Sequence, residues 1–141
     1  MKVGVITLMT ALLFAWPALA GTDPCPGPDT DSDGTDDLCD NCSEVPNAAQ
    51  YDGDQDGYGD ACDCDYSTST NNACDGADFV QFAGKFGTTV PPTSCEYDHA
   101  VNGAVDGGDF IAFSGLFGKK PGPACGNPRG TACLAPGAPC P

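Results

Sequence analysis

Aspartates recur at fixed spacing in two twelve-residue segments of the chain, residues 29–40 and 52–63. Each segment has aspartate at positions 1, 3, 5, 9 and 12 and glycine at position 6. A hard dication takes six to eight oxygen ligands, which a tightly curled backbone can supply from alternate side chains and from the carbonyl of position 7. The predicted ligands are Asp29, Asp31, Asp33, Thr35, Asp37 and Asp40 in the first loop, and Asp52, Asp54, Asp56, Tyr58, Asp60 and Asp63 in the second.

Calcium is the ion that these two loops predict, because magnesium keeps several of its waters and is rarely enclosed by so many protein ligands. The alternative is an acidic, solvated and disordered stretch. Such a stretch explains clustered acids, but not the same ligand phase twice with Gly34 and Gly57 both at position 6. Five carboxylates in one loop repel each other, so the metal-free chain should still resemble that disordered state.

An internal repeat follows, in which residues 64–87 align with residues 95–118 without a gap and half of the positions are identical. This indicates a duplication. Each copy carries three phenylalanines at i, i+3 and i+7, which predicts a short helix with one apolar face, and Gly87 and Gly118 follow as stop signals. We expect the two faces to bury each other. The residues are Phe79, Phe82 and Phe86 in the first copy and Phe110, Phe113 and Phe117 in the second.

A further twelve-residue loop precedes each predicted helix. In residues 98–109 the third position is Ala100, which donates no oxygen, so weaker binding is expected. In residues 67–78 Ser67 replaces the first carboxylate and Asn72 replaces the glycine, and binding should be weaker still. The predicted ligands are Asp98, Asn102, Ala104 (through its carbonyl), Asp106 and Asp109 in the second copy, and Asn71, Asp75 and Asp78 in the first.

The composition of the chain indicates which interactions stabilise its folded structure. Its formal net charge is −15, which disfavours nucleic acid as a partner. Of the 121 residues after residue 20, only 19 are Val, Ile, Leu, Phe or Tyr, and 30 are Gly or Pro. That is too little apolar material for an ordinary core, so bound cations and disulfides are expected to supply the order.

The first twenty residues read as a signal peptide, with Lys2, an apolar run over 3–16 and a small-residue cleavage site ending at Ala20. We therefore expect a secreted, extracellular or cell-surface protein without a membrane span. Ten cysteines after the cleavage site fit disulfides in an oxidising compartment. Thiolate metal sites stay open as the alternative, because Cys39 and Cys42, like Cys62 and Cys64, are close pairs.

Residues 29–63 resemble a thrombospondin type 3 repeat. The residues that carry the resemblance are Asp40-Asn41-Cys42, Asn47, Gln50 and the run from Gly57 to Asp63. The resemblance implies calcium ions wrapped by extended chain with little regular secondary structure. It also implies a disulfide between Cys42 and Cys62.

Residues 64–120 resemble a type I dockerin, which has duplicated EF-hand-like calcium loops, each followed by a helix, with aspartate at position 12. This resemblance implies docking on a cohesin-like receptor. Dockerins commonly carry a Ser/Thr pair at loop positions 10 and 11, whereas this chain has Gly76-Ala77 and Gly107-Gly108 there. The scaffold is therefore expected to carry over, and the partner specificity is not.

Catalysis is not expected. The only histidine, His99, falls at position 2 of a calcium loop, where its side chain should point outward. Common nucleophile, zinc-protease and phosphate-binding motifs are absent from the sequence. The aspartates have the phase of metal ligands, and there is little apolar material to wall a pocket.

The sequence thus predicts a small calcium- and disulfide-stabilised protein. A linker (21–28) leads to an irregular calcium-wrapped module (29–63), then to a mainly α, dockerin-like pair of EF-hand-like loop–helix repeats (64–120), and to a Gly/Pro/Cys-rich tail (121–141). The three cysteines of the tail cannot all pair among themselves, so at least one is expected to reach back to the body of the protein or to another chain; otherwise the tail reads as extended. The expected function is structural or protein-binding and non-enzymatic, outside the cell. One alternative is an adaptor that docks on a cohesin-like receptor and anchors an extracellular or polysaccharide-degrading complex. Another is a terminal anchoring fragment of a once larger exported enzyme.

Overall fold

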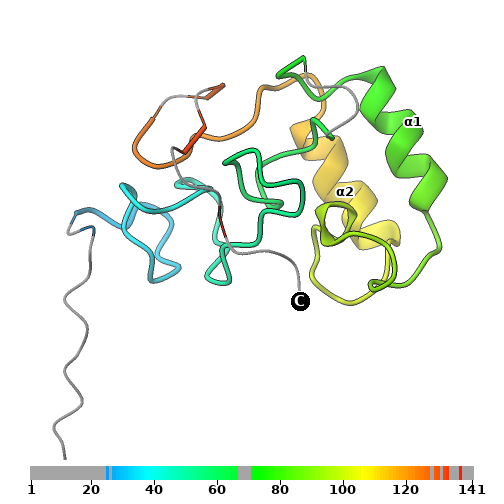
Figure 1. Ribbon diagram of the computed structural model, residues 1–141, viewed down its shortest axis with the longest axis horizontal. Coiled ribbons are helices and arrows are strands. Elements are labelled where there is room, and N and C mark those ends of the chain that lie inside the picture. Colours follow the sequence, from blue (N-terminus) through cyan, green and yellow to red (C-terminus); the bar gives the residue numbers. More distant parts are fainter. Residues whose placement is uncertain are drawn as a thin grey trace, which may run out of the picture.

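The computed structural model describes residues 25, 27–66, 71–127, 129–130, 132–133 and 137. The predicted signal peptide lies outside these residues. Three helical elements are present in the described chain: α1 (Gly76–Lys85), the short 3-10 helix η1 (Cys95–Tyr97) and α2 (Gly107–Leu116). Residues 27–66 contain neither helix nor strand. Figure 1 shows the irregular first half (residues 27–63) at one end of the molecule and the helical half (residues 64–66 and 71–120), which contains α1 and α2, at the other.

The α-helices begin at aspartates of the repeated loops. Asp75 and Asp106 are the N-caps, and each accepts a hydrogen bond from the backbone N–H two residues on, at 2.7 Å. Asp78 and Asp109 complete a capping box in each helix. The helices stop as predicted, because Gly87 and Gly118 adopt φ angles of 83° and 79°, which favour glycine.

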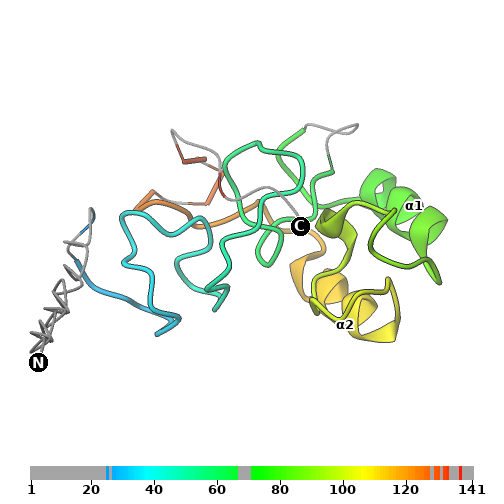
Figure 2. The same ribbon diagram turned by 60° about the horizontal axis from the view of Figure 1, so that its bottom comes forward.

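The core lies between the two helices, which pack side by side in Figure 2. Only the middle phenylalanine of each triplet is fully buried: Phe82 is 1% exposed and Phe113 2%, with ring centroids 5.1 Å apart. The expectation that all six rings are buried is wrong. The other four are about half exposed, because a two-helix layer has no second layer to cover its edges. The buried core cluster is Cys64, Tyr66, Cys74, Phe82, Tyr97, Val105 and Phe113.

Disulfides brace the described chain, and none of its cysteines is free. The bonds are Cys25–Cys39, Cys42–Cys62, Cys64–Cys74 and Cys125–Cys133, with Cα–Cα distances of 5.2–5.7 Å. Cys95 is also disulfide-bonded. The Cys42–Cys62 pairing that the thrombospondin resemblance implies is therefore present. The close cysteine pairs separate into different disulfides, which leaves no thiolates there for a metal.

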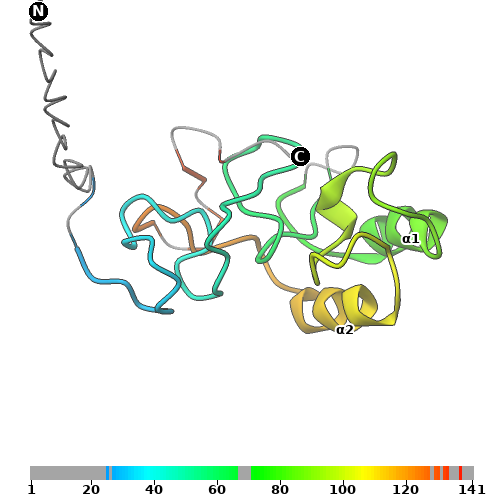
Figure 3. The same cartoon turned by 90° about the horizontal axis from the view of Figure 1, so that it is seen from below.

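The segment after α2 is not the extended tail that its composition predicts. It folds back over the first half, and in Figures 1 and 3 it runs beside the loops of residues 30–60. Backbone hydrogen bonds hold it there: Ser43 N to Pro123 O at 3.0 Å, and Cys133 N to Gly57 O at 3.0 Å. Glycine and proline set no repetitive structure, but they leave backbone groups able to pair with those of the irregular loops.

No helix in the described part of the chain is long and apolar enough to cross a membrane.

Candidate metal centre

The first Asp-rich loop is closed by its own carboxylates. Asp29, at position 1, accepts hydrogen bonds from the backbone N–H of Ser32 at 2.7 Å and of Gly34 at 3.1 Å. Asp33 accepts from Thr35 N at 2.8 Å. Gly34 has a φ of 97°, a conformation that side chains with a Cβ rarely adopt. The glycine at position 6 thus lets the chain turn sharply around the carboxylates.

The second loop repeats this geometry in the same phase. Asp52 accepts from Gly57 N at 3.1 Å and Asp56 accepts from Tyr58 N at 2.9 Å. Gly57 has a φ of 96°. The carbonyls of Thr35 and Tyr58, the predicted ligands at position 7, accept no hydrogen bond from residues that the structure describes. The repeated sequence therefore produces a repeated loop.

Positions 1, 3 and 5 of each loop bring their carboxylates together. In each trio one oxygen per residue lies within 4.8 Å of the others. Two ligands on opposite sides of a calcium ion are separated by about 4.6–5.2 Å, twice the usual ligand distance. The spacing therefore fits one cation per loop. The trios are Asp29, Asp31 and Asp33, and Asp52, Asp54 and Asp56.

Three buried carboxylate oxygens in these loops have no hydrogen-bond partner among the described residues: Asp31 Oδ2, Asp40 Oδ2 and Asp52 Oδ1. Asp40 is 1% exposed and Asp52 is fully buried. Leaving such an acceptor unpaired costs about 1–3 kcal/mol, and more when it is charged. Burial raises the pKa of Asp31 and of Asp40, and repulsion from Asp40 raises that of Asp31 further. One cation in each loop would pair these oxygens, those of Asp31 and Asp40 in the first loop and that of Asp52 in the second.

The other predicted ligands lock the loops instead of joining the trios. At position 9, Asp37 accepts from Thr30 N at 2.8 Å and Asp60 accepts from Gly53 N at 2.7 Å, so each bonds to position 2 of its loop. At position 12, Asp40 and Asp63 each accept from the backbone N–H two residues on, at 2.8 and 2.7 Å. Asp63 is buried, and burial raises its pKa well above the usual range.

The loop before α2 differs from the first two loops in how its carboxylates are hydrogen-bonded. Asp98 accepts from the N–H groups of Asn102 at 2.9 Å and Gly103 at 2.8 Å, one on each oxygen. Asp109 is fully buried, and its two oxygens accept from Ala100 N and Asp106 N. Within the described chain, acid trios occur only in the first two loops. The loop before α2 thus keeps the EF-hand-like frame, but its carboxylates already have hydrogen-bond donors.

The loop before α1 falls partly outside the described residues, which resume at Asn71. Asp78 is buried like Asp109 and accepts from Asp75 N at 2.7 Å and from Tyr66 N at 3.2 Å. Asn71 donates to Asp75 at 2.8 Å, as Asn102 does to Asp106 at 3.2 Å. Asn72 has a φ of 61° and so takes the left-handed turn expected of the missing glycine.

Sequence reasoning missed Asp65, which is 5% exposed and accepts from Ala73 N at 3.2 Å. Asp65 precedes Ser67, which the gap-free alignment of the repeats places at position 1 of the loop before α1. The duplicated glycines and phenylalanines anchor that alignment so firmly that a shift at its start is hidden. Allowing a gap before Asn71 would have brought the acid into consideration.

His99 does not point outward as expected. Its Nδ1 lies 2.6 Å from the carbonyl oxygen of Asp60, and its Nε2 lies 3.3 Å from the hydroxyl of Tyr66. A carbonyl only accepts, so Nδ1 carries the proton and Nε2 accepts from the tyrosine. The ring also stacks on Phe82, and burial lowers the pKa of His99. The histidine therefore links the helical half to the second loop.

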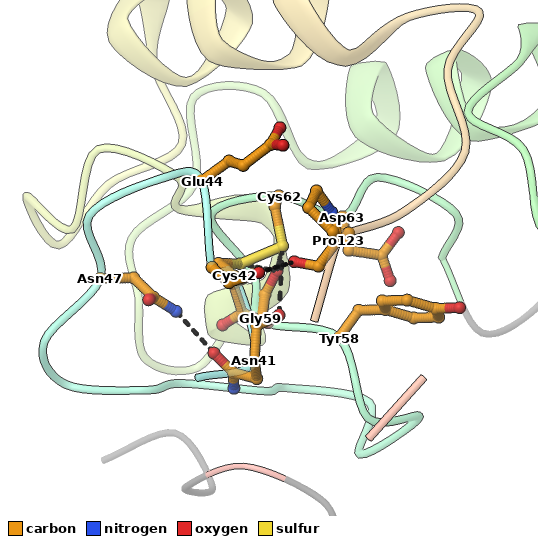
Figure 4. Close-up of a disulfide and its surroundings, with 12 residues drawn as sticks. Asn41, Cys42, Glu44, Asn47, Tyr58, Gly59, Cys62, Asp63 and Pro123 are labelled. Atoms are coloured by element: carbon orange, nitrogen blue, oxygen red, sulfur yellow. Dashed lines mark hydrogen bonds between the residues drawn. A yellow bond between two sulfur atoms is a disulfide. The ribbon is translucent and has the colours of Figure 1, made fainter. Parts of the chain in front are cut away.

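An amide network joins the first two loops around the Cys42–Cys62 disulfide, as Figure 4 shows. The side chains of Asn41 and Asn47 lie 2.6 Å apart, and Gln50 accepts from Asn41 N at 2.8 Å. Gly59 donates to Asn41 O at 3.0 Å, and a Cβ at this glycine would clash with the Asn41 side chain. These are the residues on which the thrombospondin resemblance depends.

The chain also forms a pocket, contrary to the expectation that it has too little apolar material for one. The pocket measures about 360 Å³ and lies between the first half and the repeat of the second half. Its wall combines proline, alanine and valine side chains with backbone and a few polar groups, so small residues suffice to build it. The polar side chains among its lining residues include Asn47, Asp60, Asp98 and His99.

A scan of protein-family models finds no match for this chain, and no curated protein or solved structure is significantly similar to it. The resemblances to thrombospondin type 3 repeats and to dockerins therefore remain expectations drawn from its motifs.

Proposed function

We propose that this chain is an extracellular, non-enzymatic calcium-binding protein whose Asp-rich loops fold around the ion and present a structural or protein-binding surface. The observation that carries the proposal is the pair of aspartate trios in one phase, each beside buried carboxylate oxygens that lack a partner. In each loop, the ion would be held by the side chains of the trio, the carboxylate at position 12 and the backbone carbonyl at position 7. The ion would neutralise the negative charge of the loop and would take no part in a reaction. The disulfides fit an oxidising compartment.

The test is a calcium titration of the oxidised chain by isothermal calorimetry. Asp31→Asn and Asp54→Asn each remove one charge at position 3 of one loop. We expect each to weaken that loop by about tenfold or more while the other loop binds normally, because ligand charge count sets calcium affinity. Asp36→Asn is the matched control, since Asp36 lies in the first loop outside the ligand phase and accepts from Gly27 N. Absence of calcium binding by the oxidised wild type overturns the proposal.

The adaptor alternative is supported by apolar side chains that the duplication places on both helices. Val80 is 69% exposed and Ile111, its counterpart in the second copy, is 72% exposed; Phe79 and Phe110 are half exposed beside them. Paired apolar residues on neighbouring helices are a suitable surface for a protein partner, including a cohesin-like receptor. The test is capture of a partner from the host's secreted fraction with calcium or with chelator. A specific partner lost on Val80→Asp and Ile111→Asp favours the adaptor.

A further inference from the structure

Asn102 and Gly103 form the only Asn-Gly pair in the sequence and lie at positions 5 and 6 of the loop before α2. Both residues are exposed. A backbone nitrogen that follows asparagine can attack the side-chain amide and close a five-membered imide ring. Glycine permits this approach best, because it has no Cβ beside the attacking nitrogen. The pair is therefore a candidate for loss of ammonia from the Asn102 side chain.

Three hydrogen bonds hold the reacting groups of this pair. Gly103 N, the attacking nitrogen, donates to Asp98 Oδ2 at 2.8 Å, so a carboxylate is in place to take its proton. Asn102 Oδ1 accepts from Ala104 N at 3.0 Å, and this donor stabilises the negative charge that develops on the oxygen during the attack. Asn102 Nδ2, the leaving nitrogen, donates to Asp106 Oδ2 at 3.2 Å. The loop thus supplies a base, an oxyanion donor and a fixed orientation for the amide.

We propose that Asn102 is a self-modification site, at which this loop converts the asparagine to aspartate or isoaspartate. Gly103 N forms a bond to Asn102 Cγ as the bond from Cγ to Nδ2 breaks. The proton of Gly103 N passes through Asp98 to Nδ2, which leaves as ammonia. Water then opens the imide, at Cγ to give aspartate or at the backbone carbonyl carbon of residue 102 to give isoaspartate. The reaction consumes one water and needs no oxidant or reductant.

The duplication contains an internal comparison for this proposal. Asn71 occupies position 5 in the first copy and donates to Asp75 at 2.8 Å, as Asn102 does to Asp106 in the second. The residue that follows Asn71 is Asn72, whose side chain hinders the attack, where the second copy has glycine. Asn71 should therefore react much more slowly, although its side-chain amide is held in the same way.

The modification would change what the loop can bind. Aspartate occupies position 5 in both Asp-rich loops, as Asp33 and Asp56, and the aspartate product would give the loop before α2 the same residue type. The hydrogen bond from Nδ2 to Asp106 would become repulsion between two carboxylates, which a cation relieves. The aspartate product should therefore bind calcium more tightly, whereas the extra backbone carbon of isoaspartate should disrupt the ligand spacing. This consequence rests on the proposed calcium-binding function, and the modification itself does not.

The experiment follows the oxidised full chain at neutral pH in EGTA, so that no calcium competes for Asp98. Peptide mapping by mass spectrometry measures conversion at each asparagine over time. Asn102 should convert faster than Asn71 and every other asparagine. Gly103→Asn copies the first repeat with a residue that tolerates the left-handed backbone, and it should slow conversion at Asn102 by about tenfold or more. Conversion at Asn102 that is no faster than at Asn71 overturns the proposal.

Asp98→Asn tests whether the loop assists the reaction, because an Asn-Gly pair also reacts in an unfolded chain. Loss of this base should slow conversion at Asn102 by about tenfold or more. Asp36→Asn, which removes one charge outside this loop, is the matched control and should convert as wild type does. Wild type unfolded in urea with its disulfides reduced should also convert more slowly than folded wild type, a readout that needs no variant to fold. If unfolded wild type or folded Asp98→Asn converts as fast as folded wild type, the loop gives no assistance and the proposal is wrong.

Calorimetry of Asn102→Asp tests the consequence for calcium. The loop before α2 should bind calcium about tenfold more tightly in this variant than in wild type, because ligand charge count sets calcium affinity. An unchanged affinity overturns the predicted gain in binding. A wild type that binds no calcium overturns the proposed function instead, and the conversion of Asn102 in EGTA still decides the modification.

Discussion

Buried carboxylates differ in their hydrogen bonding between the two halves of the molecule. In the helical half, Asp78 and Asp109 are fully buried, and each has both oxygens paired with backbone N–H groups. In the first half, Asp40 and Asp52 are buried as deeply, but each keeps one oxygen without a partner in the described chain. One donor to each is the N–H of the N-cap, Asp75 or Asp106, in the capping box, and the other is the N–H of a preceding loop residue, Tyr66 or Ala100. Asp40 and Asp52 therefore each have an oxygen that a cation could pair, whereas Asp78 and Asp109 have none.

Apolar burial follows the same division. The core cluster extends from Cys64 to Phe113 and contains no residue of the Asp-rich loops. In the first half the buried apolar residues are Tyr58 and the Cys42–Cys62 disulfide. Without a core, that half depends on disulfides, amide hydrogen bonds and, we propose, cations. The comparison predicts that the two halves lose order under different treatments.

Chelation should separate the halves most strongly. In the oxidised chain, removing calcium with EGTA should raise amide hydrogen exchange across residues 29–63 nearly to that of an unfolded chain, because the trios then repel without compensation. The amides of α1 and α2 should keep measurable protection, because their buried carboxylates stay paired. Hydrogen exchange read by mass spectrometry gives both values in one sample. Equal protection of both halves with and without chelator would contradict the division.

Core truncation should act on the helical half. Phe82→Ala should lower the free energy of unfolding by about 3–5 kcal/mol, because the ring is fully buried against Phe113. Phe86→Ala is the matched control: it makes the same change four residues on, at a ring 54% exposed, and should cost less than half as much. Urea unfolding of the calcium-loaded protein, followed by circular dichroism, measures both. Equal losses would mean that the edge rings belong to the core.

Local repetition explains which features could be predicted from sequence. Some features depend only on residues near in sequence, and the structure contains them. These are the repeated spacing of the loops, the turns at Gly34 and Gly57 and the helix ends before Gly87 and Gly118. The exposure of Phe79 and Phe110 depends on how many layers the fold has, which a helical period does not report.

Contacts between residues far apart in the sequence could not be predicted from local patterns, for the same reason. The inward turn of His99 depends on a carbonyl 39 residues away in the chain. The odd number of cysteines in the final segment predicts that it reaches back, but not where it lies, which depends on backbone bonds such as Cys133 N to Gly57 O. Asp65 was hidden by a repeat that aligned too well. The first two of these features join the two halves, or the last segment to the first half.

The turn glycines allow a sharper test of the first half. Gly34 and Gly57 have nearly the same φ, but a Cβ at Gly34 meets nothing within 4 Å, whereas one at Gly57 would lie 2.7 Å from the carbonyl oxygen of Cys133. Both alanine variants should lose about 1–2 kcal/mol from the left-handed backbone. Gly57→Ala should lose more, because the final segment must also move. Urea midpoints in saturating calcium measure the difference, and equal losses would show that this segment does not pack on the second loop.

The smallest effect is expected at the ion pair between Glu44 and Arg129, which lie 3.1 Å apart with 56% and 36% of their side chains exposed. An exposed pair contributes about 0–1 kcal/mol, and salt screens it. Glu44→Gln should therefore lower the unfolding free energy by less than about 1 kcal/mol at low salt and by nothing measurable in molar salt. Arg129 also donates to the carbonyl of Gly122, so Arg129→Gln should cost more than Glu44→Gln. If both variants cost the same, the contact between Arg129 and Gly122 within the final segment contributes nothing measurable to stability.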